Sequence, residues 1–254
     1  MLEIINTSSV LLPLCLFIVG LLAGFINIMA GGGSVLTLGT MILMGIDPQV
    51  ANGTNRVALV AESFAGIISF KKRLKNNILD SFQLSLWTIP GALLGAFYAV
   101  EIPPEWFQRI LVLVIIFVIL TILFPMKLPQ EDNSEDYPKI FYVSLILIGF
   151  YGGFIQAGIG FVIMVCFRQI AGMSLLEINI HKVFLVLIYT LPVLGIFVAT
   201  GNINWLYALF LGAGNFIGAW FSASVSVSKG DLVIKRVVAL AMALMATQLL
   251  LDTL

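Results

Sequence analysis

Long apolar runs are the feature that most constrains this chain. An α-helix needs about 20 apolar residues to cross a bilayer core of about 30 Å. Candidate spans lie at roughly 8–29, 48–70, 78–100, 105–126, 139–158, 176–199, 203–225 and 231–252. Two further apolar runs, at roughly 34–45 and 160–172, are too short to span alone. These lengths predict an all-α polytopic membrane protein, because a membrane β-barrel would show alternating segments of about ten residues.

The composition supports a lipid-facing exterior. Only 10% of the 254 residues are charged and 60% are hydrophobic, whereas a soluble domain carries about 25% charged residues. The net charge is zero and no basic tract suggests a nucleic-acid partner, so we expect the lipid bilayer as a partner and no nucleic acid. Met1–Val10 lacks the basic residues of a signal peptide, so we expect the first apolar run to be retained. We predict a multi-pass protein of the cell (inner) membrane.

The two halves of the chain resemble each other. A polar linker at 127–138 separates a first repeat, 1–126, from a second, 139–254. Matching pairs in the same order are Gly20 and Gly149, Gly24 and Gly153, Asn27 and Gln156, Asn52 and Asn179, Gly91 and Gly214, Gly95 and Gly218, and Arg109 and Arg236. These matches predict two structural repeats of five segments each, with one short broken helix in each repeat.

Five segments is an odd number, so the second repeat must enter the membrane upside down. The loop with Lys71, Lys72, Arg73 and Lys75 is the strongest cytoplasmic signal, because basic residues favour that side. Successive spans cross the membrane in alternate directions, which places the 127–138 linker in the cytoplasm and both termini outside. The sequence therefore predicts inverted repeats.

Glycine-containing breaks precede both short runs, Gly31-Gly32-Gly33 in one repeat and Gly158-Ile159-Gly160 in the other. Interrupted segments at matching positions of inverted halves indicate a binding site. Helices beginning near Ser34 and Phe161 would present free N–H groups, which attract anions. The alternative is that these glycines only allow close helix packing, but their recurrence as a pair favours a site.

Polar side chains cluster around the breaks. Ionisable groups inside a bilayer usually face a cavity or a partner, although cations near helix ends can also reach the interface. The expected substrate-binding residues are Asn27, Gly31, Gly32, Gly33, Ser34, Asn55, Arg56, Gln156, Gly158, Gly160, His181 and Lys182. Helix N-termini and amides would hold an oxyanion, and Arg56 and Lys182 would supply charge. Glu62 and His181 are candidates for coupling to protons or sodium.

Enzymatic chemistry has little support in the sequence. Ser34 has no nearby base, no His, Asp or Glu cluster has metal-ligand spacing, and the glycine run lacks the ending of a P-loop. Cys15 and Cys166 lie within apolar runs, which argues against a disulfide framework or a zinc site. We therefore expect a protein that is not an enzyme, with no metal and no cofactor.

The stretches Gly24–Ser34, Ala51–Asn55 and, more weakly, Gly152–Gly160 resemble the sulfite exporter TauE/SafE family. The resemblance implies a secondary transporter of sulfite or small organosulfonates, with export favoured and alternating access around an anion site between the repeats. An anion channel that uses the breaks as a filter is the alternative, and assembly as a homodimer is left open. The second repeat departs from the pattern: Phe161 replaces the expected Ser, and His181-Lys182 replaces Thr54-Asn55. An asymmetric site is therefore expected.

Overall fold

The computed structural model describes residues 2–70, 78–123 and 137–225. These residues form ten helices and no strand, which confirms the all-α prediction for the described part of the chain. The helices are α1 (Leu2–Ala30), α2 (Gly33–Leu43), α3 (Pro48–Phe70), α4 (Ile78–Leu86), α5 (Ile89–Glu101), α6 (Pro104–Leu123), α7 (Lys139–Phe154), α8 (Ile159–Ala171), α9 (Leu175–Ala199) and α10 (Trp205–Val225).

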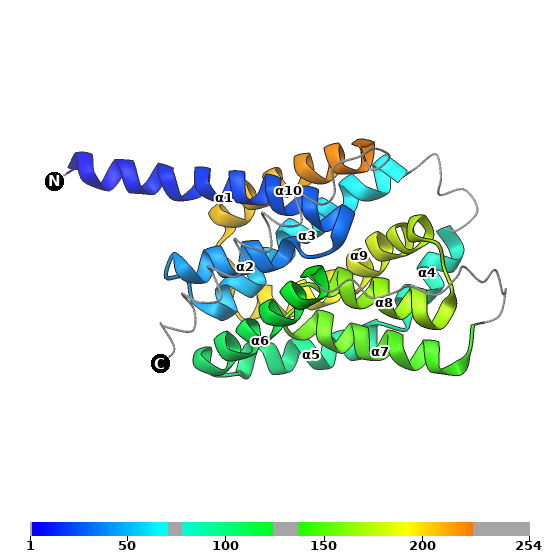
Figure 1. Ribbon diagram of the computed structural model, residues 1–254. Coiled ribbons are helices and arrows are strands. Elements are labelled where there is room, and N and C mark those ends of the chain that lie inside the picture. Colours follow the sequence, from blue (N-terminus) through cyan, green and yellow to red (C-terminus); the bar gives the residue numbers. More distant parts are fainter. Residues whose placement is uncertain (1, 71–77, 124–136, 226–254) are drawn as a thin grey trace.

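The helices form a layered bundle. In Figure 1, α1 and α10 lie together along one side and α5 and α7 along the opposite side, with α2, α3, α8 and α9 between them. The middle layer contains the two short helices that follow the predicted breaks, so both breaks lie in the interior. The long helices α3 and α9 pack against each other and against the outer pairs.

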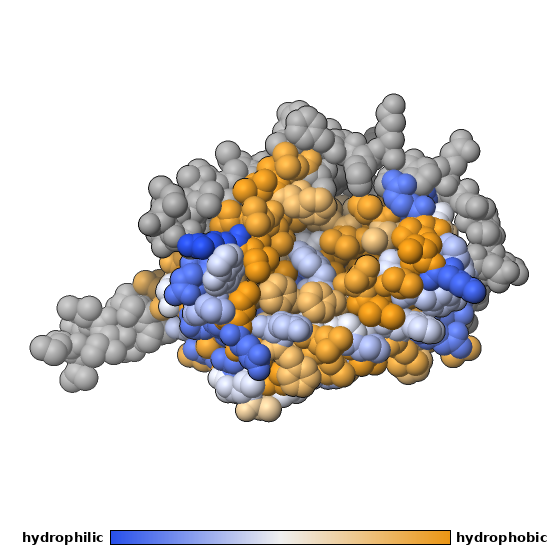
Figure 2. All heavy atoms as spheres, turned by 90° about the horizontal axis from the view of Figure 1, so that it is seen from below, coloured by the Kyte–Doolittle hydropathy of each residue, from blue (hydrophilic) through white to orange (hydrophobic). Residues whose placement is uncertain are grey.

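The outer face of the α5–α7 layer is apolar. In Figure 2, hydrophobic residues predominate in the middle of this face, with weakly polar ones between them, and strongly hydrophilic residues gather at its two ends. Large exposed side chains here include Leu94, Phe97, Leu147 and Phe150. By length and composition, Leu11–Met29 of α1 and Leu175–Ala199 of α9 suit a membrane span, as does the bent pair α4–α5 if it counts as one. The total number of crossings stays a prediction.

Two of the predicted spans are not continuous helices over their full length. The 78–100 run is not one helix but α4 and α5, bent by 49°. Pro90 explains the bend, because its ring clashes with the carbonyl of Leu86, four residues earlier, where α4 ends. The 139–158 run ends as a helix at Phe154. The predicted 231–252 span, Arg236, the Lys71–Lys75 loop and most of the linker lie outside the described residues.

Glycines spaced four residues apart form a stripe on each of four helices: Gly20 and Gly24, Gly91 and Gly95, Gly149 and Gly153, and Gly214 and Gly218. These glycine stripes pack the two halves crosswise, that is, a helix of one half against a helix of the other. The first helix of each half, α1 or α7, lies against the fourth segment of the other half, α10 or α5. A Cβ on Gly95 would lie 2.7 Å from the main-chain nitrogen of Phe154, and one on Gly218 would lie 2.9 Å from that of Phe25. Glycine therefore permits direct backbone contact in both pairs. Such reciprocal packing of the first helix of each half against the fourth segment of the other is what two related halves would produce. The inversion of the halves stays a prediction.

Both breaks adopt backbone conformations that favour glycine. In the first, Gly31 has φ +85° and Gly32 precedes α2. The second spans Ile155–Gly158, with φ +62° at Gln156 and +68° at Gly158. It therefore starts before the predicted Gly158-Ile159-Gly160, and Gly160 lies within α8. The two breaks touch: a Cβ on Gly31 would lie 2.8 Å from the nitrogen of Phe161.

Substituting Gly95 tests the crosswise packing. Gly95→Ala places a methyl group against the α7 backbone, so we expect it to lower the free energy of unfolding by about 1–3 kcal/mol. Gly195→Ala is the matched control, because a Cβ at that helical position meets nothing within 4 Å. Thermal unfolding of the purified variants in detergent measures both. Equal melting temperatures would show that α5 and α7 do not touch as described.

Substituting Gly31 separates backbone strain from contact between the breaks. Gly31 and Gly45 have similar φ values, +85° and +79°, but a Cβ on Gly45 meets nothing within 4 Å. Both alanine variants pay about 1–2 kcal/mol for the left-handed backbone. We expect Gly31→Ala to lose clearly more stability in the same unfolding assay, since it also pushes the breaks apart. An equal loss in both variants would contradict the contact.

Candidate functional site at the helix breaks

Ser34 joins the two breaks. It lies in the first turn of α2 and is 2% exposed. Its hydroxyl donates to the carbonyl of Gln156 over 3.3 Å and accepts from the main-chain N–H of Gly158 over 3.2 Å. Gly33, which follows Gly32 at the start of the same turn, brings α2 close to α1. The first break is thus tied to the second by one side chain.

Unpaired donors surround this junction. The side-chain amide oxygen of Asn55 accepts from Thr37 over 2.6 Å, which leaves its Nδ2 without a partner among the described residues. Neither side-chain polar atom of Gln156 has a hydrogen-bond partner there. Asn55 and Gln156 are both 0% exposed. Buried amides without partners are rare and need an explanation, and a bound ligand is one.

Arg56 bonds to the end of α7. Its guanidinium donates to the carbonyls of Gly152 over 3.0 Å and Gly153 over 2.5 Å, and it lies 4.7 Å from the centre of the Phe197 ring. Its Nε has no partner among the described residues. The side chain is 0% exposed. Arg56 therefore neutralises the negative end of the α7 dipole, and its Nε–H remains available for a further bond.

Lys182 makes the corresponding bonds to the end of α1. Its ammonium donates to the carbonyls of Asn27 and Ile28, both over 3.0 Å, and to the side-chain oxygen of Asn179 over 2.8 Å. An ammonium has three donors, and these three bonds use all of them. In this conformation, Lys182 has no donor left for an anion, and its role in anion binding stays a prediction.

These two cations follow the crosswise pattern of the fold. Each comes from the third helix of one half and binds the last carbonyls of the first helix of the other half. Alignment of Asn52 with Asn179 places Lys182 opposite Asn55 and leaves Arg56 opposite Val183, so the two cations lie one residue apart in register. Asn52 adds a bond from its Nδ2 to the carbonyl of Phe154 over 2.8 Å.

Glu62 is buried among amides. One carboxylate oxygen accepts from Asn27 over 2.6 Å, and the other accepts from Asn215 over 3.3 Å. The side chain is 5% exposed. Glu62 does not share the bonding partners of Arg56. It belongs to a second cluster with Asn27, Lys182 and Asn215, in which α1, α3, α9 and α10 meet.

His181 is separated from the breaks by its bonding. Its Nδ1 lies 2.9 Å from the hydroxyl of Ser81 on α4, and its ring centre lies 6.0 Å from that of Phe167. No contact in the described residues joins its ring to Ser34 or to Arg56. His181 therefore stands apart from the other predicted site residues, although Lys182 is its neighbour in sequence.

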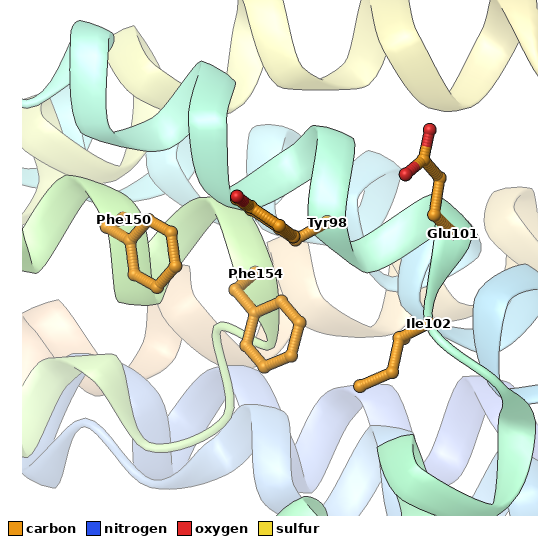
Figure 3. Close-up of a pocket in the computed structure, with 5 residues that line it drawn as sticks. All are labelled: Tyr98, Glu101, Ile102, Phe150 and Phe154. Atoms are coloured by element: carbon orange, nitrogen blue, oxygen red, sulfur yellow. The ribbon is translucent and has the colours of Figure 1, made fainter.

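None of the predicted site residues lines the surface cavity of the structure. It has a volume of about 420 Å³ and is lined by Tyr98, Glu101, Ile102, Phe150 and Phe154. Figure 3 shows Tyr98 and Glu101 on α5, with Phe150 and Phe154 on α7. Its lining contains aromatic rings and a carboxylate but no cation, which does not suit an anion. Among the described residues, no three His, Cys, Asp or Glu side chains lie together as a metal site.

Asn215 belongs to the Glu62 cluster but was not among the residues predicted from the sequence. It donates to Glu62, and its backbone packs against Gly24. An amide in the otherwise apolar Trp205–Val225 segment was an available signal, because polar groups at membrane depth usually have a functional partner. Thr37 and Asn179, which bind Asn55 and Lys182, were also absent from the predicted set.

Comparisons with known proteins agree on the class. The chain is 31% identical to a probable membrane transporter protein, ORF9, of Sinorhizobium, over 93% of this chain and 92% of that one. It is 27% identical to the probable membrane transporter protein YfcA of Escherichia coli K12, over 99% and 95%. It is 26% identical to a probable membrane transporter protein of Haemophilus influenzae, over 93% and 94%. No solved structure matches. The model of the sulfite exporter TauE/SafE family matches residues 16–249, and the chain belongs to this family of membrane transporters.

Proposed function

We propose that the protein is a secondary transporter of small sulfur-containing anions, sulfite or an organosulfonate, in the cell (inner) membrane. Two repeats, 1–126 and 139–254, alternate access to a site between them. The membrane transporter class comes from the family, and the family description names sulfite. The place of the anion site and the charge of the anion are argued from the contacts of the described residues.

The unpaired donors at the junction of the breaks carry this proposal. Asn55 Nδ2, Arg56 Nε and Gln156 Nε2 are buried donors without partners among the described residues. A buried donor left without a partner costs about 1–3 kcal/mol. An oxyanion bound by these groups would remove that cost. Glycine in both breaks allows the backbone to come close to such a ligand.

The charges near the junction favour a small anion. Arg56 is a cation that carries one of the unpaired donors, whereas Lys182 bonds to the α1 carbonyls. An organosulfonate that also carries a carboxylate would need a second available cation. The arrangement therefore favours sulfite or a singly charged sulfonate.

Exchange in proteoliposomes tests the proposal. Vesicles loaded with sulfite, sulfoacetate, taurine or sulfate are placed in labelled external anion, and the rate of exchange is measured. We expect saturable exchange for sulfite or one sulfonate, because a carrier must bind its substrate in each cycle. Absence of exchange with folded protein would refute the proposed substrate class. Currents that do not saturate would favour the anion channel.

Variants of the unpaired donors test the site. Arg56→Gln should abolish exchange, because it removes a cation that carries one of the donors. It also removes bonds to α7, so Asn55→Asp is the second variant: it keeps the acceptor for Thr37 and replaces the free donor with a negative oxygen. We expect at least about a tenfold slower exchange, since one hydrogen bond to a charged group contributes about 1.5–3 kcal/mol. Asn202→Asp, in the α9–α10 loop, is the control. Normal exchange by folded Arg56→Gln and Asn55→Asp would remove these residues from the site.

A further inference from the structure

The end of α1 forms a cage of oxygen atoms around one cation. The carbonyls of Asn27 and Ile28 and the side-chain oxygen of Asn179 lie 2.8–3.0 Å from a single point, the Nζ of Lys182. Carbonyls at the C-terminal ends of interrupted helices coordinate sodium in many transporters. This chain has such a set of oxygens, but its own ammonium group occupies it.

A tethered ammonium excludes sodium from this cage. For sodium to enter, Lys182 would have to give up three hydrogen bonds. Its charge would then remain in an interior where the side chain is only 6% exposed. An unpaired buried charge is strongly unfavourable. The cage therefore serves as a permanent internal cation site.

Glu62 is the titratable partner of this cation. It is the one buried carboxylate among the described residues, and Lys182 is the cation that acts on it electrostatically. Asn27 connects them, since its side chain donates to Glu62 and its carbonyl accepts from Lys182. A carboxylate can take up a proton, whereas the neighbouring amides of Asn27 and Asn215 cannot.

Within the part of the chain that the structure describes, few other titratable groups face this pair. Tyr189 on α9 acts electrostatically on both Arg56 and Glu62. Arg56 lies on α3 with Glu62 but bonds to α7. The Leu11–Ala30 part of α1 and all of α10 carry no charged side chain. The charge balance of the cluster thus depends mainly on Glu62 and Lys182.

We propose that this transporter is coupled to protons and not to sodium, with Glu62 as the proton-binding group and Lys182 as the resident cation. This inference rests on the proposed anion transport. When the Glu62 carboxylate takes up a proton, the positive charge of Lys182 is no longer balanced. An anion entering the junction offsets the positive charge that the proton adds to those of Lys182 and Arg56, so proton and anion binding favour each other. One proton and one anion then cross together and are released on the other side.

Gradient-driven uptake tests the coupling. Proteoliposomes with the membrane potential clamped at zero receive labelled sulfite, and uptake by empty vesicles is subtracted. Sulfite exchange at equal pH first reports whether anion transport occurs at all. A tenfold proton gradient should then support up to about tenfold accumulation, because each tenfold ratio carries the same free energy. A sodium gradient should support none.

Glu62→Gln identifies the proton-binding group. The amide cannot take up a proton, so we expect proton-driven accumulation to be lost and exchange to become insensitive to pH. Glu105→Gln, at an exposed position in the first turn of α6, is the matched control and should behave as the unmodified protein. Proton-driven accumulation in Glu62→Gln, or sodium-driven accumulation in the unmodified protein, would overturn the proposal. Exchange without a response to either gradient would overturn it as well.

Infrared spectroscopy gives a readout that does not depend on the anion. Acidifying the reconstituted protein should produce the band of a buried protonated carboxyl, distinct from that of the exposed carboxyls, which is present in Glu105→Gln, absent in Glu62→Gln and unaffected by sodium. If sulfite does not exchange but this band appears, the proposed substrate fails and the proton site stands. If sulfite exchanges but the band is missing, the transport function stands and the proton site is wrong.

Discussion

Interrupted helices in an apolar interior leave carbonyl groups that need donors, and this requirement shapes the centre of the molecule. Helices α1 and α7 both end inside the bundle, where water is not available to bond their last carbonyls. Lys182 and Asn52 with Arg56 supply those donors from the opposite half. Each half therefore completes the other, and the crosswise contacts of α1 with α10 and α5 with α7 hold the donors in place.

Much of the fold follows from the apolar runs, because helix length in a bilayer depends on burying apolar side chains. The run at 48–70 coincides with α3, and the run at 160–172 lies within one residue of α8 at each end. The bend between α4 and α5 had a visible signal in Pro90, but the apolar run continues through it. The crosswise pairing could not be read from the glycine stripes, since a stripe shows that a helix packs closely and not which helix it meets.

The sequence pointed to individual polar residues but not to the bonds that they make, and their role in a binding site stays a prediction. Asn27, Ser34, Asn55, Arg56 and Gln156 were identifiable because polar groups at membrane depth are few. Their partners were not, because each bond joins residues that are brought together only by the crosswise packing. The sequence places Lys182 beside His181, yet the two side chains reach α1 and α4 respectively. Helical geometry explains this, since adjacent residues on a helix point in different directions.

One short stretch of backbone, residues 27–34, joins the anion junction to the cation cage. At its start, Asn27 binds Glu62 through its side chain and Lys182 through its carbonyl. At its end, Ser34 binds the second break at Gln156 and Gly158. Between them, Gly31 touches Gly160. A movement of this stretch that closed or opened the junction would change the bonds of Glu62 and Lys182 at the same time. Coupling between the two sites then needs no long relay, because both are attached to the same eight-residue segment of chain.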